Sequence, residues 1–284
     1  SSRLYKFHRP RIPLNQTPHP LKRESRTCIK SLLAYHMRRS PPPYPISKTA
    51  AVLVALFVGR MGDLYVLLSR RSETLRSYAG DTALPGGKVD PADESIEDTA
   101  RREAFEEIGL PQNKDKIPLL CVLDPFLAGN NMLVTPVVVL ILDNTLRPVL
   151  NQPEVALLFS HPLAGFLSIT APSIPSNTDP EHDTEHHELD SAAELAAVEL
   201  QYHTYTDMAW PFRPGAAPEP SGRATRLHRF LTGRETRGVK PVFGLTAAIL
   251  IRVAQLGFGR EPEFDMYAQG QPDMRTRVAW AVRN

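Results

Sequence analysis

Three glutamates near the middle of the chain are spaced so that a single helix would bring them together. Glu103, Glu106 and Glu107 lie within LPGGKVDPADESIEDTARREAFEEIGL, residues 84–110. At about 100° per residue they share one sector of the helix, beside a stripe of alanine and isoleucine that can be buried. Like charges at this spacing repel one another. By themselves the three residues favour an ordinary solvated acidic face, but a divalent cation would turn the repulsion into binding.

The residues that precede this helix favour the cation. LPGG, residues 84–87, predicts a backbone turn between a strand and the helix, with glycines that let a ligand approach closely. We expect the helix over residues 97–109, with its N-terminus facing the turn at 85–88 and the three carboxylates converging on one point. Because hard oxygen donors suit Mg²⁺ or Mn²⁺ and leave room for phosphate, the pattern predicts a metal and a phosphate in one site.

Residues 84–110 resemble the Nudix box. Glu94 is followed by seven residues and then by REAFEEIGL, residues 102–110, although six residues rather than the usual five separate Gly87 from Glu94. The resemblance implies an α/β fold, the Nudix α/β/α sandwich with a mixed β-sheet. It also implies an enzyme that uses a divalent metal ion to hydrolyse a nucleoside diphosphate linked to another moiety.

The resemblance gives each carboxylate of the box a role. Glu106 and Glu107 would be the main metal ligands, assisted by Glu103 and by the carbonyl oxygen of Gly87. Metal ions held there would neutralise the pyrophosphate, orient a water molecule and stabilise the leaving phosphate. The three glutamates are therefore the expected catalytic residues.

Two further box residues are expected to hold the loop rather than to contact substrate. In proteins with this box the arginine pairs with acids, so Glu94 and Arg102 are expected to be structural. The group that takes the proton from water stays open. Glu103, Glu106 and Glu154, which lies outside the box, are the candidates.

A second resemblance narrows the substrate. LLSRRSETLRSYAGDTALPGG, residues 67–87, is similar to the signature of coenzyme A pyrophosphatases, a Nudix subgroup with fungal peroxisomal-type members. Arginines that lead into a phosphate turn suit a ligand with an additional phosphate, although solvated arginines at a strand end are common. The expected substrate-binding residues are Arg70, Arg71, Arg76, Gly86 and Gly87.

The combined hypothesis is an enzyme that cleaves coenzyme A or a derivative to 3′,5′-ADP and 4′-phosphopantetheine or its acyl form. One alternative is a hydrolase that removes oxidised nucleotides such as 8-oxo-dGTP, which the same box chemistry supports. Another is a nucleotide-binding Nudix module without turnover. Loss of box carboxylates would favour the module, and all of them are present.

Alternating strand and helix patterns surround the box. Residues 50–59 and 63–71 read as a β-hairpin, and the β-branched run at 134–143 reads as a strand. EVALLFSHP, residues 154–162, is expected to begin with a short helical or turn segment, and residues 242–259 are expected to form a largely buried helix. Strands between helices predict a mixed sheet in one domain, residues 46–260.

The flanks differ in composition. Residues 1–45 are basic and rich in proline, and we expect an extended arm with a short amphipathic helix at 26–39. Residues 174–194 are acidic and read as a flexible insertion. Its histidines could bind a metal, but a solvated loop is favoured; they are His182, His186 and His187. Residues 261–284 are expected to form a C-terminal tail.

The composition argues against a disulfide-rich protein, a zinc-binding protein and a membrane-spanning protein. The net charge is +2, and the two cysteines, Cys28 and Cys121, lack the spacing of a disulfide framework or a zinc site. Apolar runs are too short for a membrane span, and no segment has the layout of a signal peptide. The basic arm could bind nucleic acid or direct the protein to an organelle, but it lacks the aromatic pattern of a nucleic-acid module, and a solvated extension is favoured. We expect an intracellular protein in the peroxisome, mitochondrion or cytoplasm, with a coenzyme A-type nucleotide as partner; a homodimer stays open.

Overall fold

The computed structural model describes most of the chain outside the acidic stretch. The predicted insertion at 174–194 lies outside the described residues, as do parts of the basic arm. The described residues are 2–5, 12–15, 17–37, 44–143, 145–172, 201–210 and 223–283. Among them no helix is both long and apolar enough to cross a membrane.

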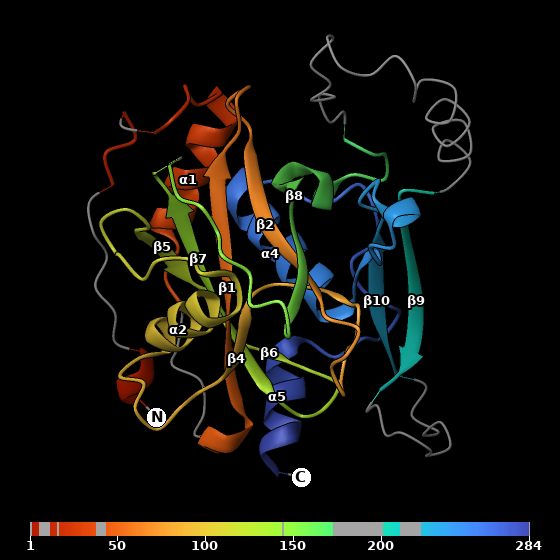
Figure 1. The fold of residues 1–284 in the computed structure, drawn as a ribbon. Coiled ribbons are helices and arrows are strands. Elements are labelled where there is room, and N and C mark those ends of the chain that lie inside the picture. Colours follow the sequence, from red (N-terminus) through yellow and green to blue (C-terminus); the bar gives the residue numbers. More distant parts are fainter. Residues whose placement is uncertain are drawn as a thin grey trace.

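A mixed β-sheet forms the centre of the described structure (Figure 1). Its strands follow the order β3-β2-β1-β7-β5, while β4 pairs with β1, β6 with β7 and β8 with β2. β1 and β7 run parallel, and the other pairs are antiparallel. The strands are β1 (Thr49–Val58), β2 (Leu64–Arg71), β3 (Thr82–Ala83), β4 (Gly86–Lys88), β5 (Leu119–Val122), β6 (Phe126–Leu127), β7 (Leu133–Ile141) and β8 (Val155–Pro162).

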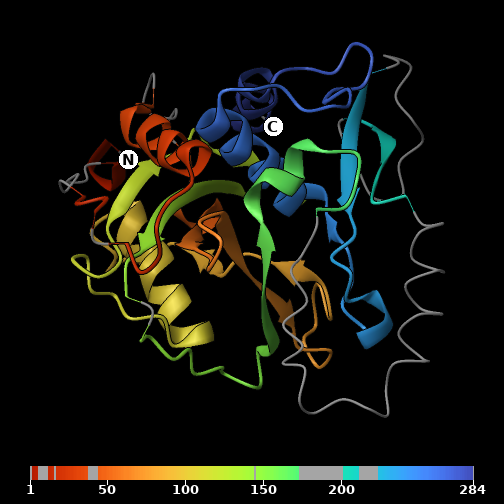
Figure 2. The ribbon, with the colours of Figure 1, turned by 90° about the horizontal axis from the view of Figure 1, so that it is seen from above.

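Helices cover both faces of this sheet (Figure 2). Side chains of β1 alternate between two cores: Ala51, Leu53 and Ala55 pack with α2, whereas Val54 and Leu56 pack with α1 and α4. This period of two on an apolar strand requires a helix layer on each face. The predicted α/β/α sandwich is therefore confirmed. The helices are α1 (Arg23–Ala34), α2 (Ile96–Ile108), α4 (Gly244–Phe258) and α5 (Met274–Arg283).

The predicted elements around the box are largely confirmed. The hairpin is β1 and β2, the strand at 134–143 is β7, and the buried helix is α4 preceded by the short strand β11 (Val242–Phe243). The expectation for residues 154–162 is correct only at the start, because the turn ends at Glu154 and the rest is β8. β8 is a strand because it pairs along the free edge of β2 and buries Val155 and Phe159.

A second sheet lies beside β2 and β8 (Figure 1). It contains β9 (His203–Ala209), β10 (Ala224–Phe230) and β11, in the order β11-β10-β9. The segment before β11 is joined to the loop after β2 and to β3: Lys240 Nζ lies 2.7 Å from Asp81 Oδ1, and Thr82 Oγ1 donates to the Lys240 carbonyl oxygen at 2.5 Å. The coenzyme A-like stretch therefore contacts residues far away in the sequence.

Both flanking segments contribute a helix that packs on the body. α1 begins three residues before and ends five residues before the predicted helix at 26–39, and its buried Cys28 and Leu32 pack against Gly257 of α4. α5 lies in the predicted tail, where Val278 and Ala281 pack with Leu127 and Leu133 at the ends of β6 and β7. Short 3-10 helices complete the described structure: Ser2–Tyr5, Ile46–Lys48, Leu163–Leu167 and Glu235–Arg237.

Candidate active site

The box residues lie where β1 changes its partner along one edge. β4 pairs with residues 50–52 of β1, and β2 pairs with residues 56–58. Beyond these residues β2 diverges from β1 and pairs on that edge with β3, while β8 pairs along the other edge of β2. α2 packs across β1 and β4, on the side of the sheet opposite α1 and α4. The end of β2, the strand β4 and the second half of α2 therefore meet at one place.

The turn expected at 85–88 is largely a short strand in the structure, and the N-terminus of α2 does not face it. Residues 86–88 are the strand β4, which lies so close to β1 that a Cβ on Gly86 would be 2.3 Å from the Ala51 carbonyl oxygen. The middle and end of α2, rather than its N-terminus, face β4. The helix runs from the Ser95 cap, whose Oγ accepts the Asp98 N–H, to Gly109 in the left-handed conformation. This direction carries the N-terminus away from β4.

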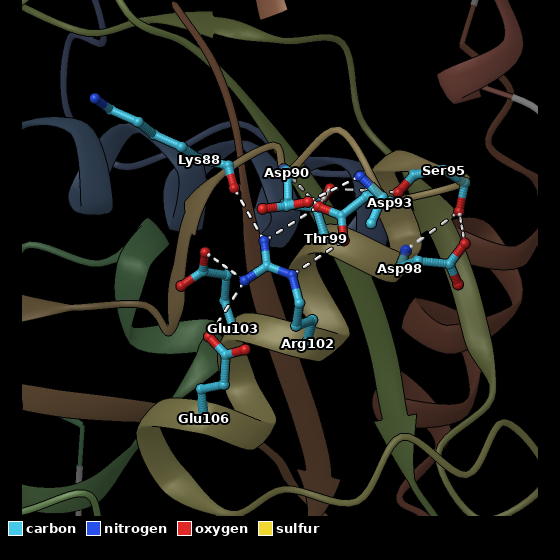
Figure 3. A network of polar contacts seen from close by, with 10 residues as sticks. Lys88, Asp90, Asp93, Ser95, Asp98, Thr99, Arg102, Glu103 and Glu106 are labelled. Atoms are coloured by element: carbon cyan, nitrogen blue, oxygen red, sulfur yellow. Dashed lines mark hydrogen bonds and ion pairs between the residues drawn. The ribbon is translucent and has the colours of Figure 1, made fainter. Parts of the chain in front are cut away.

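Arg102 holds the loop between β4 and α2 (Figure 3). Its Nε and Nη2 donate to the two carboxylate oxygens of Asp93 at 3.0 and 3.1 Å, and Nη2 also donates to the Lys88 carbonyl oxygen at 3.1 Å. Burial alone would raise the pKa of Asp93, but hydrogen bonds from Arg102, the Asp90 N–H and Thr99 outweigh it and lower the pKa. Arg102 thus joins α2 to β4 and to the loop between them, and its structural role stays a prediction.

Asp93, rather than the predicted Glu94, is the acid that pairs with Arg102. Glu94 is exposed, whereas the carboxylate side chain of Asp93 is 6% exposed. Five residues, 88–92, separate Gly87 from Asp93, so the extra residue of the loop follows the pairing acid instead of preceding it. Counting five residues forward from Gly87 would have identified Asp93, but counting back from the helix selected Glu94.

Glu103 and Glu106 share the remaining nitrogen of the same guanidinium (Figure 3). Arg102 Nη1 donates to Glu103 Oε1 at 3.0 Å and to Glu106 Oε2 at 3.2 Å. The Glu103 carboxylate lies against β4, since a Cβ on Gly87 would be 2.5 Å from its atoms. Burial raises the pKa of Glu103, Arg102 opposes this, and the neighbouring carboxylates of Glu106 and Glu154 add to the rise.

Glu107 is the most buried of the three glutamates, with 5% exposure. Its Oε2 accepts the Gly86 N–H at 3.1 Å, and its Oε1 lies 3.6 Å from Arg71 Nη1. Burial raises its pKa to about 7 against the opposing effects of Gly86 and Arg71, and the carboxylates of Glu103 and Glu154 contribute to the rise. These carboxylates therefore share one negative electrostatic environment.

The donor set suits a hard cation, but the side chains do not form the expected cluster. In the described part of the chain, no three His, Cys, Asp or Glu side chains are arranged to hold a metal ion. Arg102 lies between Glu103 and Glu106, and Glu107 turns towards Gly86. The convergence of three carboxylates on one point is therefore not found. The neighbouring carboxylates contribute to the raised pKa values of Glu103 and Glu107, and with the glycine backbone they nevertheless provide the oxygen ligands and the negative field that Mg²⁺ or Mn²⁺ requires.

The three predicted substrate-binding arginines do not come together. Arg71 points to α2 and Glu107, whereas Arg70 pairs with Glu73, and Arg76 is exposed in the loop after β2. A register shift in the pairing with β8 falls between Arg70 and Arg71, and such a bulge redirects a side chain at a strand end. Glu154 is placed beside Arg71 because its carbonyl oxygen accepts the Ser72 N–H at 2.8 Å.

Comparison with known proteins places this arrangement in a family. The NUDIX domain pattern matches residues 47–162. The uncharacterised Nudix hydrolase NudL of Photorhabdus laumondii is 41% identical over 140 residues, which cover 48% of this chain and 72% of NudL. The chain therefore belongs to the Nudix family.

More specific names come from relatives of which the chain covers less than half the length. Peroxisomal coenzyme A diphosphatase 1 of Saccharomyces cerevisiae is 44% identical over 95 residues, 32% of this chain and 28% of that protein. The mitochondrial Nudix hydrolase 15 of Arabidopsis thaliana is 42% identical over 121 residues, 42% of each chain. Among solved structures, the Nudix hydrolase RenU of M. smegmatis has a TM-score of 0.36 and 22% identity, covering 54% of this chain and 88% of that one.

Proposed function

We propose that this protein is a metal-dependent Nudix pyrophosphohydrolase that cleaves coenzyme A or a derivative to 3′,5′-ADP and 4′-phosphopantetheine or its acyl form. The observation that carries the proposal is the buried Glu107, held between the Gly86 N–H and Arg71 at the junction of the box and the coenzyme A-like stretch. The name of the yeast relative supports the choice of substrate.

The residues of the site are assigned separate roles in hydrolysis. Bound Mg²⁺ or Mn²⁺ would neutralise the pyrophosphate and make water a stronger nucleophile. Glu103, Glu106 and Glu107, with the Gly87 carbonyl oxygen, are the proposed ligands, and Arg71 is the proposed contact to a pyrophosphate oxygen. Water forms a new bond to phosphorus, the bridging P–O bond breaks, and the water proton passes to a carboxylate.

Glu154 deserves testing as the proton acceptor beside the box glutamates. Its side chain is half-buried, it is close enough to raise the pKa of both Glu103 and Glu107, and no ion pair occupies it among the described residues. Glu103 and Glu106 both accept hydrogen bonds from Arg102 Nη1. All three remain candidates for the base, and Glu154→Gln with unchanged metal affinity but lower turnover would select Glu154.

Product analysis tests the proposed function. The purified protein is incubated with coenzyme A, ADP-ribose, NADH and 8-oxo-dGTP, with Mg²⁺ or Mn²⁺ and with a chelator, and products are identified by mass spectrometry. We expect 3′,5′-ADP and 4′-phosphopantetheine from coenzyme A, only when metal is present. Faster cleavage of 8-oxo-dGTP than of coenzyme A would favour the sanitising hydrolase, and nucleotide binding without cleavage would favour the non-catalytic module.

A further inference from the structure

Arg70 lies on the opposite side of β2 from the box. It pairs in register with Leu157 of β8, next to the pair of Leu68 and Phe159, so these side chains share one face of the two strands. Leu68 and Phe159 belong to the core that contains α4 and β10, not to the core of α2. The guanidinium of Arg70 contacts the exposed Glu73, while its Nε is buried without a hydrogen-bond partner in the described structure.

A second arginine, from the segment before β11, lies over this same face. Arg234 Cζ is 5.2 Å from the centre of the Phe159 ring, and Nη1 donates to the Thr232 carbonyl oxygen at 3.0 Å. Phe159 and Arg70 are diagonal neighbours on the paired strands β8 and β2. Gly238, four residues after Arg234, lies beside Arg70, because a Cβ there would be 3.7 Å from Arg70 Nη1.

The charge of Arg234 is poorly compensated. Burial, and then the neighbouring Arg237, lower the pKa of Arg234, and Glu235 opposes them. Glu235 Oε1 is itself occupied, since it accepts the Thr232 N–H at 2.6 Å and the Thr232 hydroxyl at 3.1 Å. No ion pair to Arg234 forms among the described residues. A half-buried cation beside further cations is costly by itself and is stabilised by an anion.

We propose that Arg70 and Arg234 form a subsite for a phosphomonoester of the nucleotide, separate from the pyrophosphate that is cleaved. The inference rests on the proposed function, which supplies a substrate with a 3′-phosphate. Arg71 lies on Glu107 at the α2 side of β2, and Arg76 is exposed in the loop after β2. Arg70 and Arg71 are consecutive at the end of β2, so one nucleotide would pass around this strand end to contact both. The incoming phosphate replaces the Glu73 carboxylate on Arg70.

Binding of two small nucleotides tests the subsite without any turnover. Calorimetry compares 3′,5′-ADP with 5′-AMP, which lacks the 3′-phosphate, at fixed ionic strength. Charge-assisted contacts of this kind predict a preference of ~10- to 100-fold for 3′,5′-ADP in the unaltered protein. Arg234→Gln should reduce that preference to about threefold or less and leave 5′-AMP binding unchanged. Arg229→Gln is the matched control, because Arg229 also lies over an aromatic ring but is exposed on β10.

A second variant keeps the proposal testable if Arg234→Gln does not fold. Glu73 has 72% of its side chain exposed, so Glu73→Gln should leave the fold intact. It frees Arg70 of a competing carboxylate, and we expect 3′,5′-ADP to bind ~3- to 10-fold more tightly with no change for 5′-AMP. Equal binding of the two nucleotides by the unaltered protein, or a preference that survives Arg234→Gln, would overturn the subsite.

Hydrolysis separates failure of the subsite from failure of the proposed function. Coenzyme A and dephospho-coenzyme A differ by the 3′-phosphate alone. If coenzyme A is cleaved but Arg234→Gln leaves the ratio of the two kcat/KM values unchanged, the subsite is wrong and the proposed function stands. If neither compound is cleaved but the preference for 3′,5′-ADP is lost in Arg234→Gln, the subsite stands and the proposed function is wrong.

Discussion

Arg70 and Arg71 are adjacent in the sequence, yet they face two different electrostatic environments. On the α2 side every described arginine near the box has a carboxylate partner: Arg71 lies on Glu107, and Arg102 contacts Asp93, Glu103 and Glu106. On the side of β10 and β11, Arg234 has none among the described residues, and Arg70 has only the exposed Glu73. One stretch of sequence therefore supplies Arg71 to the acidic side, which faces α2, and Arg70 to the basic side, which faces β10 and β11.

The difference shows that consecutive residues of one motif at a strand end can point to opposite faces of the sheet. Successive side chains of a strand point to opposite faces, so Arg70 and Arg71 serve one ligand only when that ligand bends around the end of β2. A nucleotide with a pyrophosphate and a separate phosphomonoester has this shape. The acidic side is suited to metal-assisted cleavage, and the basic side to recognition of the second phosphate.

The largest expected effect follows from removing the Glu107 carboxylate, which lies at the centre of the acidic side. Glu107→Gln should lower kcat for the best substrate by roughly a hundredfold or more, because it removes a metal-binding charge that acts in the transition state. Steady-state kinetics at saturating Mg²⁺ measures the change. Glu94→Gln is the matched control, since Glu94 is an exposed glutamate in the loop before α2, and it should alter kcat less than about twofold. Equal losses in both variants would contradict the assignment.

The second prediction replaces each of the two neighbouring arginines, Arg70 and Arg71, with glutamine in separate variants. Arg71→Gln should lower kcat/KM by roughly tenfold to a hundredfold for coenzyme A and dephospho-coenzyme A alike, because both contain the pyrophosphate. Arg70→Gln should lower kcat/KM for coenzyme A alone. Identical substrate ratios in the two variants would show that the faces of β2 do not differ in function.

Much of the acidic side could be predicted from the sequence because its signals are local. The cap at Ser95, the glycine at the end of α2 and the spacing of the glutamates define a helix and one of its faces. The apolar runs of β1 and β7 likewise indicate their burial. Asp93 was missed because a loop with one extra residue admits two alignments, and only the position of Arg102 in space decides between them.

The basic side depends on contacts between distant parts of the chain. The segment before β11, which carries Arg234, reaches Arg70 only because it packs on the loop after β2 and on β3, where Lys240 contacts Asp81 and Thr82. No periodic pattern in the sequence records such a pairing. α5 was likewise missed in the predicted tail, since its short apolar face becomes visible only against Leu127 and Leu133.

The third prediction uses the pH dependence of stability in the presence of a chelator. The pKa of Glu107 is about 7 in the folded protein and near 4.5 without burial, so the folded state keeps a proton that the unfolded chain releases between these values. The free energy of unfolding should therefore fall as pH rises from 4.5 to 7, by roughly 2 to 3 kcal/mol from this group.

Glu107→Gln should lack this part of the pH dependence and be more stable than the unaltered protein at pH 8. Urea unfolding of both proteins at several pH values gives the difference, from which the other titrating groups largely cancel. Parallel curves for the two proteins would show that Glu107 is not perturbed by burial.

The smallest expected effect tests whether Asp93 or Glu94 holds the loop between β4 and α2. Asp93→Ala removes two charge-assisted hydrogen bonds to Arg102 and contacts to Thr99 and the Asp90 N–H, and should lower the free energy of unfolding by about 1 to 3 kcal/mol. Glu94→Ala, on the next residue, should stay within about 0.5 kcal/mol because the side chain is exposed. Urea unfolding at pH 7 compares them. A larger loss for Glu94→Ala would restore the pairing predicted from the box spacing. The expected order instead means that Arg102, once anchored by Asp93, is held where it can contact Glu103 and Glu106 together.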